Sequence, residues 1–247
     1  MRQTGNTILI TGGTSGIGRA LAERFHAAGN KVVIAGRRQA LLDEVTAANP
    51  GMAGYAVDMT DGAAIADLAA RVVADHPDLN ILINNAGIMR METLTARRDL
   101  SDAEETIITN LLAPIRLVDA LVEHLSVQDG AAIVNTTSGL AFVPLVATPT
   151  YNATKAAMHS YTQALRAQLS GKVEVIELAP PAVQTDLTPG QSTREGYMPL
   201  REYIDEVMTL FAQVPTPAEI LVKKVGFLRF AEAEGRYAEA FAALNAH

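Results

Sequence analysis

The feature that most constrains the fold is a regular alternation of short apolar runs with longer amphipathic segments. The runs are rich in β-branched residues and almost continuously apolar, as in parallel strands covered on both faces. The predicted strands are Thr7–Thr11, Lys31–Ala35, Gly54–Val57, Ile81–Asn84, Ala131–Thr136 and Val173–Leu178. The predicted helices between them are Ile17–Ala28, Gln39–Ala48, Gly62–Ala74, Asp102–Leu125 and Tyr151–Leu169. Repeated strand–helix units with right-handed crossovers predict an α/β fold of three layers around a doubly wound parallel sheet.

The pattern changes after Leu178. A long irregular insert at the carboxyl edge of a parallel sheet is more often functional than idle, so residues 186–212 are predicted to form a substrate lid. Residues 216–247 are predicted to form two C-terminal helices, the first with Pro217 at its first position, and no seventh strand is expected. Nothing in the sequence suggests a linker or repeat, so residues 1–247 are predicted to form one domain.

Composition excludes several classes of function. The chain of 247 residues has no cysteine, which removes disulfides, thiolate metal sites and cysteine nucleophiles. Its net charge of -7, with scattered basic residues, gives no footprint for nucleic acid. No apolar stretch approaches the roughly 20 residues that a membrane-spanning helix needs, and no signal pattern opens the chain. We therefore expect a cytoplasmic protein with no nucleic-acid or membrane partner.

A glycine-rich segment joins the first predicted strand to the first predicted helix. Glycines let the backbone turn sharply and approach a pyrophosphate, while the helix N-terminus offers unpaired N–H groups. Such a cluster also serves ordinary tight turns, but a strand before it and a helix after it favour phosphate binding. The predicted phosphate-binding residues are Gly12, Thr14, Ser15, Gly16, Ile17 and Gly18.

Three motifs in order resemble the short-chain dehydrogenase/reductase family. They are Thr11-Gly12-x3-Gly16-x-Gly18, Asn84-Asn85-Ala86-Gly87 and Tyr151-x3-Lys155, and the similarity extends from about Thr7 to Thr185. The resemblance implies a Rossmann-like sheet, a nicotinamide cofactor, and a catalytic set formed by Asn110, Ser138, Tyr151 and Lys155. It also implies cofactor contacts at Asp58, Met59, Asn85, Ala86, Gly87, Tyr151, Lys155 and Thr185.

The choice of cofactor is predicted from the residues after the second strand. A carboxylate there would hold the ribose 2′-hydroxyl of NAD, but this chain has Gly36-Arg37-Arg38. Arginine suits a 2′-phosphate, so Arg37 predicts that NADP(H) is preferred, with NAD(H) possible. Two alternatives stay open: Arg37 and Arg38 can be a solvated strand end, above all Arg38, and Asp58 can cap the following helix.

The spacing of Tyr151 and Lys155 places them one turn apart on one helix face. Lowering a tyrosine pKa from about 10 to about 7 requires about 4 kcal/mol. One ammonium at about 4 Å, in an effective dielectric constant of about 20, supplies about 4 kcal/mol. The sequence therefore predicts Tyr151 as the general acid/base, activated by Lys155.

Two further residues complete the predicted site. Ser138 follows the fifth strand, at the edge where ligands bind, and its hydroxyl can donate to a developing alkoxide. Asn110 stands four residues before Pro114, which has no N–H to offer the Asn110 carbonyl, so a kink and a bound water are expected there. In the family that this sequence resembles, that water leads to the catalytic lysine. A merely loop-capping serine and a tolerated proline are the alternatives.

The predicted function is hydride transfer between NADP(H) and a carbonyl or secondary alcohol. The alternative is a non-catalytic dinucleotide-binding sensor protein, since a fold alone does not fix function. No metal site is expected from the spacing of the histidines. A homodimer is predicted, with the small residues of the Tyr151 helix in the contact. The substrate is predicted to be small, apolar and uncharged, bound by Leu140, Phe142, Val143, Leu145, Val146, Met198, Tyr203, Ile204, Met208 and Phe211.

Overall fold

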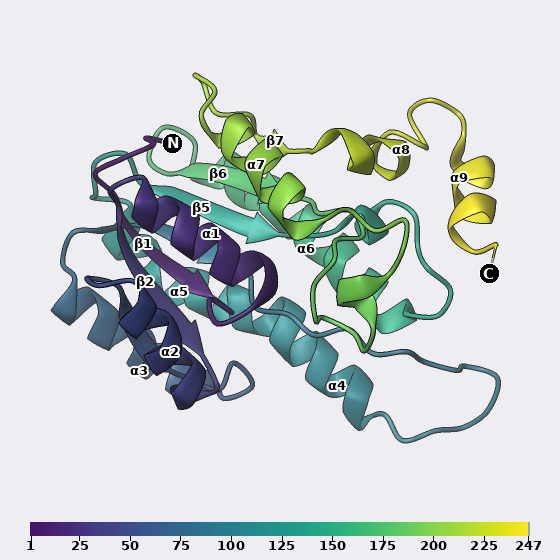
Figure 1. The fold of residues 1–247 in the computed structure, drawn as a ribbon, viewed down its shortest axis with the longest axis horizontal. Coiled ribbons are helices and arrows are strands. Elements are labelled where there is room, and N and C mark those ends of the chain that lie inside the picture. The colour runs from purple at the N-terminus through teal and green to yellow at the C-terminus, as the bar shows by residue number, and fades with distance from the viewer. Residues whose placement is uncertain (247) are drawn as a thin grey trace.

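Seven parallel strands form one sheet in the computed structural model, which describes residues 1–246 (Figure 1). The strand order is β3-β2-β1-β4-β5-β6-β7, so the order reverses between β1 and β4. The strands are β1 (Thr7–Thr11), β2 (Lys31–Gly36), β3 (Ala53–Ala56), β4 (Leu79–Asn84), β5 (Ala132–Thr136), β6 (Glu174–Leu178) and β7 (Glu219–Ile220). The predicted doubly wound parallel sheet is confirmed, and its switch point is where such folds bind ligands.

Helices cover both faces of this sheet, which gives the three predicted layers (Figure 1). Along β1, Ile8 and Ile10 face one helical layer and Leu9 faces the other, and all three are buried. The first layer contains α1 (Gly16–Ala27), α2 (Gln39–Ala48) and α7 (Leu200–Phe211). The second contains α3 (Gly62–Asp75), α5 (Ala113–Leu125) and α6 (Pro149–Gln168). None of the helices in the described part of the chain has the length and hydrophobicity needed to cross a membrane.

The expectation of no seventh strand is wrong. Glu219 and Ile220 pair with Glu177 and Leu178 of β6, and the Ile220 side chain is fully buried. A strand of two residues has no periodicity to detect, and Pro217 just before it is equally typical of the first position of a helix. The structure instead has α8 (Gly226–Arg229) and α9 (Tyr237–Leu244), which lie beyond the sheet at the right of Figure 1.

The long helix predicted at Asp102–Leu125 is interrupted near its middle. A π-helical turn, Ile108–Leu112, separates α4 (Ser101–Ile107) from α5. It contains Asn110 and ends just before Pro114, where the missing N–H predicts a disturbance. At the start of α4, the Asp99 carboxylate accepts hydrogen bonds from the Ser101 N–H and hydroxyl at 3.0 and 2.9 Å.

The second half of the predicted lid segment, 186–212, is mainly helix α7, which packs on α1. Tyr203, Ile204 and Phe211 are buried in the same core as the first face of the sheet, and the Phe211 ring meets the Phe25 ring edge-on at 5.6 Å. These side chains serve the core and do not line a substrate pocket, which corrects that part of the prediction. The apolar stripe of α7 is typical of a lid over a substrate and of a helix in the core, so the sequence alone does not distinguish these two roles.

Candidate active site

A cleft of about 550 Å³ lies at the carboxyl edge of the sheet, over the switch point between β1 and β4. Its size is that of a small-molecule or cofactor site. Most of the residues predicted from the sequence line it: Gly12, Thr14, Ser15, Gly16, Ile17, Arg37, Asp58, Met59, Asn85, Ala86, Gly87, Ser138, Tyr151, Lys155 and Thr185. Gly18 and Asn110 do not line the cleft, and both lie directly behind it.

The glycines of the loop after β1 permit close backbone contacts. Gly12 has a φ of 68°, and an added Cβ there would lie 2.9 Å from the Ala86 Cα. A Cβ on Gly18 would lie 2.3 Å from both the Gly12 oxygen and the Asn85 Nδ2. Gly18 therefore allows the first turn of α1 to pack against the loop. Because Gly18 faces the loop backbone, it does not line the cleft.

Hydrogen bonds tie this loop to the end of β4. The Thr11 hydroxyl oxygen accepts from the backbone N–H groups of Asn85 and Ala86 at 3.0 and 3.1 Å. The Asn85 amide in turn donates to the Thr11 carbonyl at 3.1 Å. The two motifs thus form one rigid wall of the cleft at the N-terminus of α1, where unpaired N–H groups suit a phosphate.

The basic end of the cleft combines Arg37 with two acidic neighbours. Arg37 is half exposed and pairs with Glu105 at 3.5 Å. Asp58 accepts hydrogen bonds from the backbone N–H and the hydroxyl of Thr60, and these bonds lower the pKa of Asp58, with a smaller contribution from the charge of Arg37. Asp58 therefore caps a turn and lines the cleft at once, and Arg38 lines the cleft as well.

Tyr151 and Lys155 are both buried on α6, and burial shifts both pKa values. The Tyr151 pKa rises to about 12 because burial outweighs the opposing effect of the Ser138 hydroxyl. Burial lowers the Lys155 pKa to about 8. The Lys155 ammonium lies 5.6 Å from the centre of the Tyr151 ring and donates to the Thr136 carbonyl at 2.8 Å.

The lowering of the Tyr151 pKa that the sequence analysis calculates is therefore not found: in the protein without cofactor or substrate, this pKa is raised. That calculation counted the attraction of the lysine and omitted the desolvation of both groups, which here dominates. Tyr151 holds its proton firmly at neutral pH, so the site presents a neutral phenol as a proton donor. Lys155, with its lowered pKa, is the more easily titrated of the two.

Asn110 lies behind the cleft and fixes the chain after β4. Its side chain accepts from the Ile88 N–H and donates to the Ile88 carbonyl, both at 2.8 Å. A cavity of about 10 Å³ beside it is bordered by Asn110, Pro114, Thr136 and Lys155, among others. A volume of this order accommodates about one water molecule between polar groups.

The site residues predicted from the sequence omit several that also line the cleft. Pro180, Pro181 and Leu187 line it, together with Gln191. The buried Gln191 amide donates to the Val183 carbonyl and to the Thr185 hydroxyl, at 2.8 and 3.0 Å, and so holds the loop after β6 in place. No local pattern marks Gln191, because its partners become neighbours only through the fold of the loop.

Comparison with known proteins places the chain in a family. The family model described as "short chain dehydrogenase" matches residues 6–196. An "Uncharacterized oxidoreductase DltE" of Bacillus subtilis is 42% identical over 198 residues, covering 79% of each chain. A serine 3-dehydrogenase of Agrobacterium fabrum is 36% identical over 185 residues, covering 74% of each. The chain belongs to the short-chain dehydrogenase family, and it is an NAD(P)-dependent oxidoreductase.

Solved structures agree with this assignment over nearly the whole chain. A short-chain dehydrogenase from Burkholderia cenocepacia, in complex with NADP, has a TM-score of 0.83 at 26% identity and covers 98% of both chains. One from Sphingobium yanoikuyae, in complex with NADPH, has a TM-score of 0.82 at 27% identity and covers 96% of this chain and 95% of its own. The Rossmann-like architecture is therefore confirmed.

Proposed function

We propose that this protein reduces a carbonyl, or oxidises the corresponding secondary alcohol, with NADP(H) as cofactor and Tyr151 as general acid/base. The observation that carries the proposal is the meeting of Ser138, Tyr151 and Lys155 in one cleft with the glycine loop. A non-catalytic dinucleotide-binding sensor would have no use for a buried tyrosine–lysine pair. Turnover of NADPH with a panel of neutral aldehydes and ketones tests the proposal. Stable NADPH binding without turnover on any member of the panel would favour the sensor.

The chain's own residues divide the proton chemistry between them. The hydroxyls of Ser138 and Tyr151 donate hydrogen bonds to the substrate oxygen and stabilise the charge that develops there. Tyr151 then delivers its proton, which the raised pKa keeps available at neutral pH. The nicotinamide, when bound, supplies or accepts the hydride. The Ser138 hydroxyl oxygen accepts a hydrogen bond from the Leu140 N–H at 3.1 Å, so the hydroxyl proton is available to donate to the substrate oxygen.

Lys155 and Asn110 are proposed to return a proton to Tyr151. A lysine pKa of about 8 allows both forms of the amine to be populated near neutral pH, which suits proton transfer. The small cavity between the Asn110 turn and Lys155 is the proposed place for the connecting water. The π-helical turn supports this role, because it opens the helix at the residue whose carbonyl Pro114 leaves free.

The preference for NADP(H) rests on both charge and space. Gly36, where an NAD-specific carboxylate would stand, has no room for a side chain without displacement, since an added Cβ would lie 3.1 Å from the Thr14 Cγ2. Arg37 lines the cleft one residue later and is a bidentate donor suited to a phosphate. The two solved relatives described above contain NADPH and NADP, which supports the same choice.

The substrate is proposed to be small, largely apolar and uncharged. Apolar residues that line the cleft include Ile88, Pro180, Pro181, Val183 and Leu187, and the apolar set expected from the sequence is not among its lining residues. Pro180 and Pro181 stiffen the loop after β6 and remove its N–H donors, which favours apolar groups there. A matched series of neutral and carboxylate-bearing ketones tests this, and faster turnover of the acidic members would contradict it.

Assembly as a homodimer is also proposed, together with a cytoplasmic location and the single-domain organisation. Of the lid segment predicted at 186–212, Asp186, Leu187 and Gln191 line the cleft. The small residues Ala153, Ala156, Ser160 and Ala164 are exposed on one side of α6, as a close helix contact between two copies requires. The sequence predicts no seventh strand that a second interface could use, but β7 is present, so the dimer proposal rests on the α6 face alone. Sedimentation equilibrium distinguishes the outcomes, and a constant mass near four chains would contradict the dimer.

A further inference from the structure

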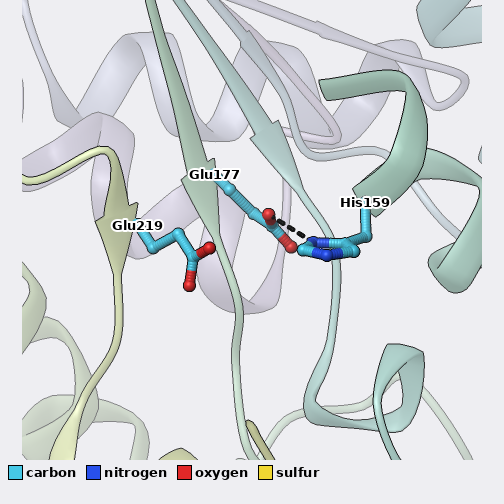
Figure 2. A group of neighbouring side chains, drawn as sticks. All are labelled: His159, Glu177 and Glu219. Carbon is cyan, nitrogen blue, oxygen red and sulfur yellow. Dashed lines mark hydrogen bonds and ion pairs between the residues drawn. The ribbon is translucent and has the colours of Figure 1, made fainter. Parts of the chain in front are cut away.

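A buried carboxylate lies beneath the proposed active site, outside the set of residues that the proposed function uses. Glu177 of β6 is fully buried, and its two oxygens accept hydrogen bonds from two different elements. The Thr137 hydroxyl donates to one at 2.6 Å, and the His159 Nδ1 lies 2.7 Å from the other. Figure 2 shows the Glu177 side chain extending from its strand to the histidine ring on α6. A carboxylate is costly to bury unless it is hydrogen-bonded in this way.

Protein groups around Glu177 satisfy both of its oxygens with hydrogen bonds. Glu219 of β7 approaches Glu177 from the other side, as Figure 2 shows, but Arg229 holds it with two hydrogen bonds at 2.7 and 2.9 Å. The Gln163 amide lies 2.9 Å from the His159 Nε2, so that nitrogen accepts and Nδ1 is left to donate to Glu177. His159, Glu177 and Glu219 have the ligand types of a metal site, yet each already has a protein partner.

This cluster connects the segment after β5, which carries Ser138, to helix α6, which carries Tyr151. Thr137 is the residue before Ser138, and its N–H donates to the Leu178 carbonyl of β6 at 2.8 Å. His159 is on α6, eight residues after Tyr151, on the side that faces the sheet. Glu177 is thus an acceptor shared by the two segments whose hydroxyls must converge on a single substrate oxygen, beside the direct bond from Lys155 to the Thr136 carbonyl.

We propose that Glu177 is a positioning residue, which fixes Ser138 relative to Tyr151 through its hydrogen bonds to Thr137 and His159; this inference rests on the proposed function. Catalytic hydrogen bonds depend on sub-ångström placement, and the supporting residues determine that placement. Glu177 does not touch the cleft itself, so its effect is exerted on the chemical step and leaves cofactor binding intact.

The test separates positioning from a structural role. Glu177→Met removes both acceptors at nearly constant volume, and we expect kcat to fall by about tenfold or more while the Kd for NADPH stays within about threefold. Thr137→Val, with the same shape but no hydroxyl, should reproduce the loss, and Thr137→Ser should restore most of kcat. Thr162→Val is the matched control: this buried hydroxyl on α6 accepts from the Asn135 amide and donates to the Met158 carbonyl, and within residues 1–246 it makes no hydrogen bond to Glu177.

A double-mutant cycle identifies the residue through which the cluster acts. If Thr137 works through Ser138, Thr137→Val should lower kcat far less in a Ser138→Ala background than in the wild type. Full additivity, or a Thr137→Val variant as active as the wild type, would overturn the positioning role. An unimpaired Ser138→Ala variant would instead contradict the proposed function, so the two failures are distinguishable.

Discussion

Substitution of Gly18 by alanine tests how the cofactor loop is built. The added Cβ would lie 2.3 Å from the Gly12 carbonyl oxygen and 2.3 Å from the Asn85 Nδ2, far inside contact distance. Because one of these atoms belongs to the backbone, the loop or the start of α1 must move. Forcing a methyl group into packed structure costs about 1–3 kcal/mol.

For a chain of this length, each kcal/mol lowers the Tm by about 2–4 °C, so Gly18→Ala should lower it by about 2–12 °C. Displacement of the phosphate-binding turn should also weaken NADPH binding by about tenfold or more, which is about 1.4 kcal/mol. Differential scanning fluorimetry and NADPH fluorescence titration measure the two effects.

Gly226→Ala is the matched control for this experiment. Its added Cβ would lie 3.6 Å from the Phe230 ring, an ordinary contact, and Gly226 begins helix α8 with a φ of -55°. We expect little change in Tm or in NADPH affinity. If Gly18→Ala changes the Tm and the NADPH affinity as little as Gly226→Ala does, the close approach of α1 to the loop is not required for phosphate binding.

Two further predictions follow from charges in the cleft. Burial lowers the Lys155 pKa to about 8 in the folded state, whereas the unfolded state keeps its ordinary value, so the unfolded chain binds the extra proton between about pH 8 and pH 10.5. The free energy of unfolding of the wild type therefore rises with pH across that window, whereas Lys155→Met lacks this contribution. Any advantage in Tm of Lys155→Met over the wild type should shrink or reverse as the pH rises from about 8 to 10.5. A difference in Tm that does not change with pH would contradict the burial of the charge. Arg37→Ala should weaken NADPH by about ten- to a hundredfold, as expected for the loss of about 1.5–3 kcal/mol, and leave NADH nearly unchanged. Arg38→Ala is the paired variant, and an equal loss with both cofactors in Arg37→Ala would refute the phosphate contact.

Local patterns were sufficient to predict most of the sheet and the cofactor loop. The first six strands are apolar runs bounded by turn residues, and the loop from Gly12 to Gly18 has a local motif. The disturbance near Asn110 was also predictable, because the missing N–H of Pro114 acts four residues away in the same helix.

Features that depend on distant segments were not predictable. Strand β7 exists because Ile220 finds a place beside Leu178, and two residues leave no pattern in the sequence. The apolar stripe of α7 fits a lid or a core helix equally well until its contact with Phe25 is known. The pKa of Tyr151 depends on how deeply the fold buries the ring, which the spacing to Lys155 does not reveal.

The central claim is that Tyr151 donates and accepts the proton during hydride transfer. Its most direct test compares wild type with Tyr151→Phe, using a ketone that the wild type reduces and following NADPH consumption. Tyr161→Phe, a half-buried tyrosine on the same helix, is the matched control. We predict that Tyr151→Phe lowers kcat by about 10²–10⁴-fold, as removal of a general acid does, while the Kd for NADPH changes little. Turnover by Tyr151→Phe within about threefold of wild type, the size of change expected for the control, would contradict the claim.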